Sequence, residues 1–156
     1  MNNFQIKSLQ DSEFSNLFKL ENQELEKLGA IKMIVDRKPG FPCRVSLQDA
    51  EIGEEVILLS YQHHQTNSPY QSSGPIFIRK NATTAILDIN EIPKMLDHRL
   101  LSIRAYDKNG MMKDSLISEG LSLKDILINT FTNPEIYYVH IHNAKAGCYN
   151  CKVERA

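Results

Sequence analysis

The spacing of apolar residues predicts a first amphipathic helix near the amino terminus. Over residues 12–28 the apolar side chains recur with the period of about 3.6 residues that places them on one helix face. Asp11 or Ser12 is a suitable N-cap, and Gly29 stands where a left-handed residue ends many helices. We therefore expect a helix over residues 12–28.

The same period recurs near the carboxyl end of the chain, over residues 123–132. Ser122 and Asp125 have the spacing of a capping box, and Pro134 stops the run. A second helix is predicted there, with a shorter helical turn over residues 92–96.

The remaining apolar segments have the composition of β-strands, because they are rich in β-branched and aromatic residues. They are residues 31–35, 55–62, 74–79, 100–107, 135–143 and 149–154. Turn-forming residues separate them, and Lys108-Asn109-Gly110 is a hairpin signal. Strands and helices do not alternate regularly, which disfavours a doubly wound parallel fold. The prediction is an α+β fold with a mostly antiparallel sheet, as one domain over residues 1–156.

Composition narrows the classes of function. The chain has 42% hydrophobic residues and a formal net charge of −1, so it predicts a folded core and no general attraction to nucleic acid or to a membrane surface. No signal segment or membrane span is recognised, and three cysteines do not form a disulfide framework. We expect a cytoplasmic protein. Neither a glycine-rich nucleotide loop nor a nucleophile elbow occurs, and no cofactor is predicted.

Strand alternation gathers the most reactive side chains of the last long strand on one face. Tyr138, His140 and His142 share that face, and Val139 and Ile141 lie on the opposite, core-facing side. The two imidazoles are about 7 Å apart along the strand, which suits a shared ligand. The alternative is a pair of half-exposed histidines with structural hydrogen bonds.

Three further polar side chains alternate with apolar ones on other strands. Tyr61 and His63 share a face near one strand end, and Arg104 projects from an otherwise apolar strand. Arg104 binds either an anionic ligand or a structural carboxylate. We expect Arg104, His140 and His142 to line one concave site that also receives Tyr61 or His63.

The cysteines allow sharper hypotheses that the sequence disfavours. A redox role for Cys148 and Cys151 requires a helix N-terminus, whereas the segment resembles a strand. Zinc bound by this pair together with His140 and His142 requires both thiols on one face, and alternation separates them, so no bound metal is expected. Cys43 is either a buried apolar side chain or a nucleophile activated by histidine.

Several motif segments resemble those of a small bacterial family of uncharacterised proteins. They are Pro39–Leu47, Ser68–Tyr70, Gly74–Arg79, His140–Ala144 and Gly147–Tyr149. The resemblance runs from about Gly29 to the carboxyl terminus and implies a soluble bacterial protein without an assigned reaction. The residues that match the motif segments are Cys43, Tyr61, His63, Arg104, His140, His142, Asn143 and Cys148. Cys151 departs from the pattern, which weakens the zinc and redox hypotheses.

Two functions stay open. The first is a small-molecule-binding protein or enzyme, in which histidine acts as acid or base and Arg104 holds an anionic group. Tyr61, His63, Tyr138, Asn143 and Cys43 are its further candidate ligand-binding residues. The second is a non-catalytic protein-interaction domain, in which Phe41, Tyr70 and nearby prolines form the contact surface.

Overall fold

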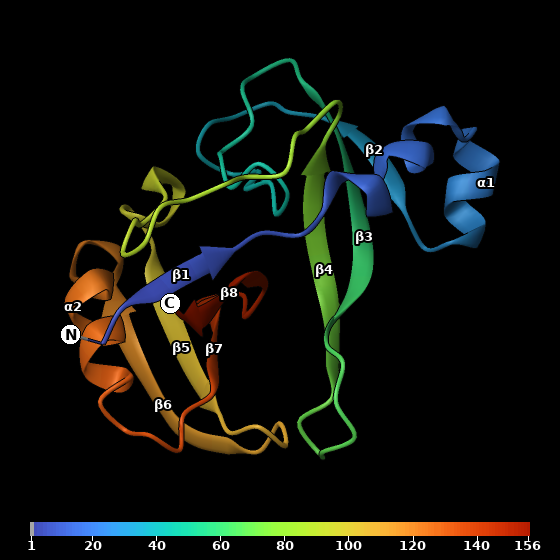
Figure 1. The fold of residues 1–156 in the computed structure, drawn as a ribbon. Coiled ribbons are helices and arrows are strands. Elements are labelled where there is room, and N and C mark those ends of the chain that lie inside the picture. The colour runs from blue at the N-terminus through green and yellow to red at the C-terminus, as the bar shows by residue number, and fades with distance from the viewer. Residues whose placement is uncertain (1) are drawn as a thin grey trace.

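The computed structural model describes residues 2–156, which form two antiparallel β-sheets, two short α-helices and several 3-10 turns (Figure 1). The larger sheet has the strand order β1 (Phe4–Lys7), β8 (Tyr149–Arg155), β7 (Tyr138–Asn143), β5 (Leu100–Tyr106) and β6 (Met112–Glu119). The smaller sheet has the order β2 (Ile31–Ile34), β3 (Glu55–His64) and β4 (Ser72–Arg79). The predicted α+β class and antiparallel pairing are confirmed, although the strands form two sheets where one was expected.

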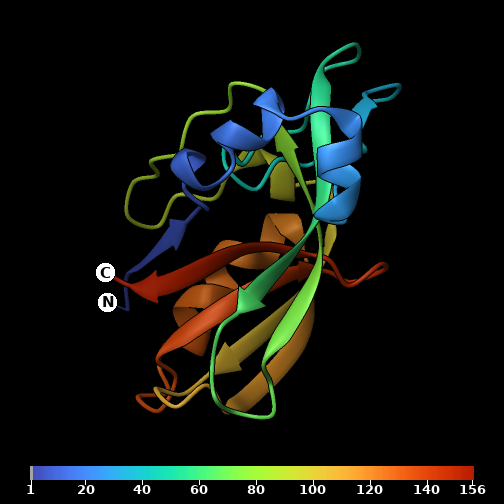
Figure 2. The same ribbon diagram turned by 90° about the vertical axis from the view of Figure 1, so that its right-hand side faces the viewer.

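The larger sheet is covered on both faces. Helix α2 (Leu123–Thr130) lies on one face, and one end of the β3–β4 hairpin lies against the other (Figures 1 and 2). Ile103, Val139 and Ile141 belong to the main hydrophobic cluster, which also contains Leu127 from α2. The side chains on the opposite face of β7 are therefore enclosed between the two sheets.

The first predicted helix is shorter than expected and begins at Asn22 instead of residue 12. Two 3-10 turns, Asp11–Glu13 and Ser15–Lys19, precede it, and α1 comprises only Asn22–Lys27. Gly29 lies just beyond the helix with a φ of 69°, which is the left-handed conformation predicted for it. The prediction is confirmed for residues 22–27 and wrong for residues 12–21, which do not form an α-helix.

The break before α1 has a local and a tertiary cause. Leu20 has an extended backbone with a ψ of 148°, and the Glu24 carboxylate accepts a hydrogen bond of 2.8 Å from the backbone N–H of Glu21. This capping interaction starts a new helix. Leu25 packs with Ile57, whereas Phe14 lies in a different cluster that includes Ile76. The two halves of the segment thus have buried residues in different clusters, and tertiary packing overrides the apolar period.

Helix α2 forms where it was predicted but ends at Thr130, two residues earlier than expected. Its predicted capping box is absent, because Ser122 has a ψ of −4° and makes no side-chain cap hydrogen bond. A 3-10 turn over Gly120–Ser122 precedes the helix and takes the place of the cap. The short turn predicted over residues 92–96 is present as Lys94–Leu96. Within residues 2–156, no helix has the length and apolar composition needed to cross a bilayer.

Two strands were not predicted as separate elements. Strand β6 pairs with β5 across the predicted Lys108-Asn109-Gly110 turn, in which Gly110 has a φ of 76°. Strand β1 has only four residues and pairs with β8 at the edge of the sheet. Strand β1 is only four residues long, and β6 is mostly polar, so apolar content does not mark either of them.

Gly120 is expected to tolerate no side chain. A Cβ atom at this position would lie 1.8 Å from the backbone oxygen of Leu96, and backbone cannot move aside as a flexible side chain can. We expect Gly120→Ala to lower the free energy of unfolding by about 3 kcal/mol or more. Gly53→Ala is the control, because Gly53 has a φ of 91° with open space around it, and it should cost only ~1–2 kcal/mol. Urea unfolding of the two variants tests the difference, and equal losses would contradict it.

Candidate functional site

An irregularity near the end of β3 directs two consecutive histidines toward β7. The pairing of β3 with β4 shifts register between Tyr61 and His64. Consecutive side chains of a regular strand point to opposite faces, and a bulge removes this restriction. The His63 ring lies 4.9 Å from that of His142, and the His64 ring lies 5.0 Å from that of His140, measured between centroids. Both β3 histidines therefore face the larger sheet.

Strand β7 supplies the other two histidines by the predicted alternation. Val139 and Ile141 are in the hydrophobic core, and His140 and His142 lie on the opposite face. The alternative of two half-exposed histidines does not describe them, because His140 is 3% and His142 only 1% exposed. The reason is the β3–β4 hairpin, which covers this face (Figure 2).

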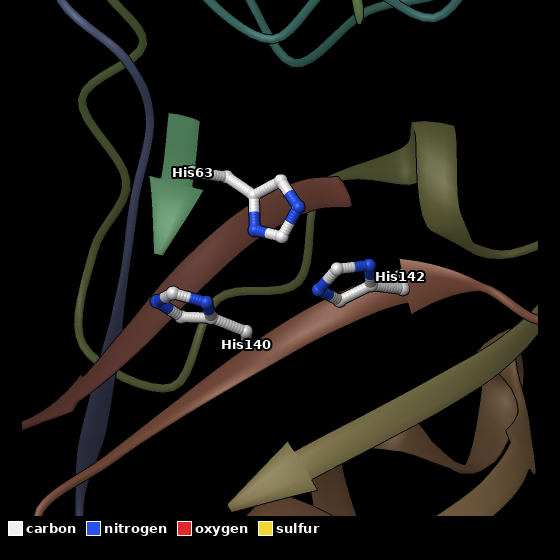
Figure 3. Close-up of side chains that lie close together, drawn as sticks. All are labelled: His63, His140 and His142. Carbon is white, nitrogen blue, oxygen red and sulfur yellow. The ribbon is translucent and has the colours of Figure 1, made fainter. Parts of the chain in front are cut away.

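Three of these imidazoles converge on one small space. One ring nitrogen from each of His63, His140 and His142 lies within 4.8 Å of those of the other two. Figure 3 shows the rings turned toward one another from β3 and β7. The buried atoms Nδ1 of His63, Nδ1 of His140 and Nε2 of His142 have no hydrogen-bond partner among residues 2–156. Each such buried polar atom costs about 1–3 kcal/mol if nothing binds it.

A hydrogen bond on the side of the ring away from the cluster fixes the orientation of His142. Its Nδ1 donates a hydrogen bond of 2.8 Å to the carbonyl oxygen of Gly147, in the turn between β7 and β8. A carbonyl can only accept, so the proton is on Nδ1 and Nε2 presents a lone pair to the cluster. A backbone carbonyl on the outer nitrogen is the usual support for a metal-ligating histidine.

Tyr149 from β8 encloses the cluster on one side. Its ring stacks on that of His63, with centroids 5.1 Å apart and an interplanar angle of 4°. A register shift between β7 and β8 pairs Tyr149 with His142 while Cys151 pairs with Ile141. This irregularity allows Tyr149 to face the histidines while Cys151 enters the hydrophobic core.

His64 is already fully engaged. Its Nδ1 donates to the carbonyl of Tyr70 at 2.7 Å, which leaves Nε2 to accept a hydrogen bond of 2.5 Å from the Tyr138 hydroxyl. Burial raises the pKa of Tyr138 to about 12, so this hydroxyl keeps its proton at neutral pH. His64 therefore supports the cluster from outside and has no free nitrogen to offer a ligand.

All three clustered histidines are neutral at physiological pH. Burial is the main cause and lowers the pKa of His140 to about 2, of His142 to about 3 and of His63 to about 4. The positive charge of Arg104 adds to the lowering of the pKa of His63 and His142. Neutral imidazole is the form that binds metal ions.

Two arginines lie beside the cluster without an acidic partner. Arg104 is directly opposite His140 in the pairing of β5 with β7, so both side chains are on the same face. Its Nε donates to the Ser102 hydroxyl at 3.2 Å. Arg44 is 2% exposed, and its Nε donates to the carbonyl of Tyr149 at 2.7 Å. Within residues 2–156, neither guanidinium has a carboxylate within 4.0 Å.

Other predicted site residues make different contacts. The Tyr61 hydroxyl donates to the Glu13 carboxylate at 3.2 Å, and its ring packs against Phe14. The Asn143 side-chain oxygen accepts a hydrogen bond of 2.8 Å from Asn150. The structure thus brings Arg104, His140, His142 and His63 together with Tyr138 nearby, while Tyr61 and Asn143 interact elsewhere. The functional role of all these residues stays a prediction.

Cys43 is enclosed in a second apolar cluster with residues such as Val45 and Ile78. Its sulfur accepts hydrogen bonds from the backbone N–H groups of Arg79 at 3.3 Å and Ser46 at 3.5 Å. These contacts favour the buried apolar side chain over the nucleophile among the two predicted alternatives.

The other two cysteines do not join the histidine cluster. Cys151 lies in the hydrophobic core with Ile141, on the face of β7 opposite His140 and His142. Burial raises its pKa to about 12, whereas a redox-active thiol requires a lowered pKa. Cys148, Cys151 and Cys43 are free thiols in the structure. The geometry thus favours neither the redox hypothesis nor zinc bound by the cysteine pair.

The aromatic contact surface expected for an interaction domain is not formed, because only one of its two aromatic side chains is exposed. Phe41, one of its two aromatic residues, is 2% exposed and packs against Phe77 inside the molecule. Tyr70 is 39% exposed, and its backbone carbonyl holds His64. One partly exposed tyrosine does not make an aromatic contact surface.

Fold and site together define the class: a two-sheet α+β protein with an enclosed three-histidine cluster. The chain belongs to the family described as Protein of unknown function (DUF1203), whose profile matches residues 40–155. The predicted resemblance to an uncharacterised family is thereby confirmed. No curated protein and no solved structure matches the chain. The matched range contains all three clustered histidines and both unpaired arginines.

The neutral histidines predict that the metal-free protein loses stability in mild acid. The unfolded chain binds protons as pH falls below the ordinary histidine pKa of 6.5, whereas folded His140 and His142 stay neutral to about pH 3. Each such histidine then costs about 1.4 kcal/mol per pH unit. From pH 7.5 to 5.0, unfolding in urea with a chelator present should show a loss of roughly 3–4 kcal/mol from this pair.

One variant assigns this loss. His140→Gln should remove about half of it, because glutamine binds no proton in this pH range. A pH dependence equal to that of the unmodified chain would contradict the assignment.

Proposed function

We propose that this protein binds a divalent transition-metal ion of the zinc class through His63, His140 and His142. One arrangement carries the proposal: a ring nitrogen from each of the three histidines lies within 4.8 Å of those of the other two, and among residues 2–156 each of these rings has a buried nitrogen without a hydrogen-bond partner. Three histidines with a fourth position left open is the ligand set of several catalytic zinc sites.

The chemistry of the cluster favours zinc over the alkaline-earth ions. Imidazole nitrogen suits zinc, copper and nickel, whereas calcium and magnesium require several oxygen ligands. Tetrahedral bonds of 2.0–2.1 Å place ligand nitrogens about 3.3 Å apart, so binding would shorten the nitrogen–nitrogen separations, which are within 4.8 Å, by up to about 1.5 Å. Because the histidines are neutral well below pH 7, protons do not compete for the ligand atoms.

The alternative is a purely structural role for packed aromatic rings. The histidines do make edge-to-face contacts, for example between His63 and His142 with ring planes at 80°. Such contacts leave the three ring nitrogens without partners, and a core of apolar rings would avoid that penalty. Support from the Gly147 carbonyl also aims the lone pair of His142 into the cluster. These features favour a ligand site over packing alone.

This proposal departs from the sequence-based expectation of no bound metal. That expectation considered the ligands available near the carboxyl terminus, where the cysteines are separated from the histidines. The third ligand is instead His63, which comes from the other sheet. When bound, zinc supplies a Lewis acid and lowers the pKa of a coordinated water. The chain's own contribution is to hold three neutral imidazoles and keep a fourth position open.

Metal binding is tested by titrating chelator-treated protein with zinc and measuring retained metal after desalting. We expect one zinc per chain and a rise in unfolding free energy of about 4 kcal/mol when free zinc is 1,000 times its dissociation constant. His63→Ala, His140→Ala and His142→Ala should each weaken binding by at least about a hundredfold, because each removes one of three ligands.

His98→Ala is the matched control, because this exposed histidine pairs with Asp49 at 3.0 Å and is not in the cluster. It should bind zinc like the unmodified chain. Circular dichroism confirms that each variant is folded before its affinity is compared. Zinc binding that survives the loss of any one clustered histidine, or no binding at all, would refute the proposed function.

A further inference from the structure

The surroundings of the histidine cluster carry a positive charge that no acidic side chain balances. Arg104 is on the same face as His140, and the buried Arg44 lies beside Tyr149, which itself stacks on His63. Burial lowers the pKa of Arg44 only to about 10, so it stays charged at neutral pH.

A metal ion therefore enters a site whose protein ligands are all neutral. In three-histidine sites the ion keeps its full charge of +2, and here two unpaired cations stand nearby. Repulsion between such charges is strong where water is largely excluded. The buried positions of His140 and His142 make this a dry environment. An anion that binds together with the ion removes most of that repulsion.

We propose that the open coordination position takes a small oxyanion, such as a carboxylate or phosphate group, which bridges the metal ion and Arg104. This inference rests on the proposed metal site and names the ligand class of that site. It also gives the sequence-predicted anionic ligand a definite place, between the β7 histidines and the β5 arginine.

The two arginines have different parts in this arrangement. The Nε of Arg44 donates to the carbonyl of Tyr149, and its Nη1 donates to the carbonyl of Pro42. These bonds immobilise Arg44, so it provides charge. Arg104 donates through Nε to Ser102, which leaves the N–H groups of its two terminal nitrogens for a ligand. A guanidinium offers such N–H groups in a planar fork that matches the two oxygens of a carboxylate or phosphate.

The size of the anion follows from the enclosure of the site. Tyr149 stacks on His63 on one side, and Tyr106 and His64 pack around His140 on the other. The two β7 histidines have almost no exposed surface. A small oxyanion fits this setting, because it needs contacts only with the ion and one guanidinium.

Linked binding provides the test. Zinc affinity is measured by competition with a chromophoric chelator, in a buffer without coordinating anions and then with acetate or with phosphate. We expect one of these anions to raise zinc affinity by on the order of tenfold, and zinc to raise the affinity for that anion by the same factor. Cobalt-loaded protein should show a change in its visible spectrum on adding the same anion, because the anion enters the coordination sphere. The acetate and phosphate arms distinguish the two oxyanions.

Variants identify the bridging residue. Arg104→Gln should abolish the anion effect on metal affinity, and Arg104→Lys should keep part of it, since lysine retains the charge but not the fork. Lys152→Gln is the matched control. Lys152 lies opposite His140 on strand β8, which pairs with β7 on the side away from β5, and its ammonium already pairs with Glu154 at 2.7 Å. It removes the same charge and should leave the anion effect intact.

The outcomes separate the two proposals. If no metal binds, the proposed function and this inference both fall. If metal binds to the unmodified chain but neither anion alters its affinity or the cobalt spectrum, only the oxyanion inference is overturned. The same conclusion follows if Arg104→Gln responds to the anion like the unmodified chain.

Discussion

The enclosure of a polar strand face between two sheets is the constraint on which the site depends. Strand β7 is buried on both sides, by α2 and the hydrophobic core on one and by the β3–β4 hairpin on the other. On the side of β7 that faces the hairpin, three imidazole nitrogens are buried away from water and have no hydrogen-bond partner among the described residues. Folding would favour apolar side chains there, so the unpartnered histidine nitrogens impose a penalty that the proposed metal ion would relieve.

Much of the fold follows from apolar periodicity, and the limits of that signal explain the errors. The helical period predicted α2, whose apolar face packs on the main hydrophobic cluster, and β-branched and aromatic composition predicted most of the strands. It failed over residues 12–21, where a new N-terminal cap at Glu21 and packing on two separate clusters replace one continuous helix. It also missed β1, a four-residue edge strand whose stability comes from pairing with β8.

The site was predictable to the extent that strand alternation holds. Alternation placed His140 and His142 on one face and Arg104 on the corresponding face of its strand. The contributions of His64 and Tyr149 were not predictable in this way, because each lies beside a register shift that alternation does not describe. Arg44 gave no signal either, since a basic residue in a loop is expected to be exposed. The adjacent histidines at positions 63 and 64 were a usable sign of an irregular strand end.

The origin of the ligands on two sheets affects how the chain can assemble. His63 and His140 are far apart in sequence, and only docking of the β3–β4 hairpin onto β7 brings them together. Of the three proposed ligands, an unfolded chain holds only His140 and His142 close together, and closing the long intervening loop is entropically costly. In the proposed metal site the ion would therefore bind late in folding, to a nearly finished structure, and would oppose separation of the two sheets.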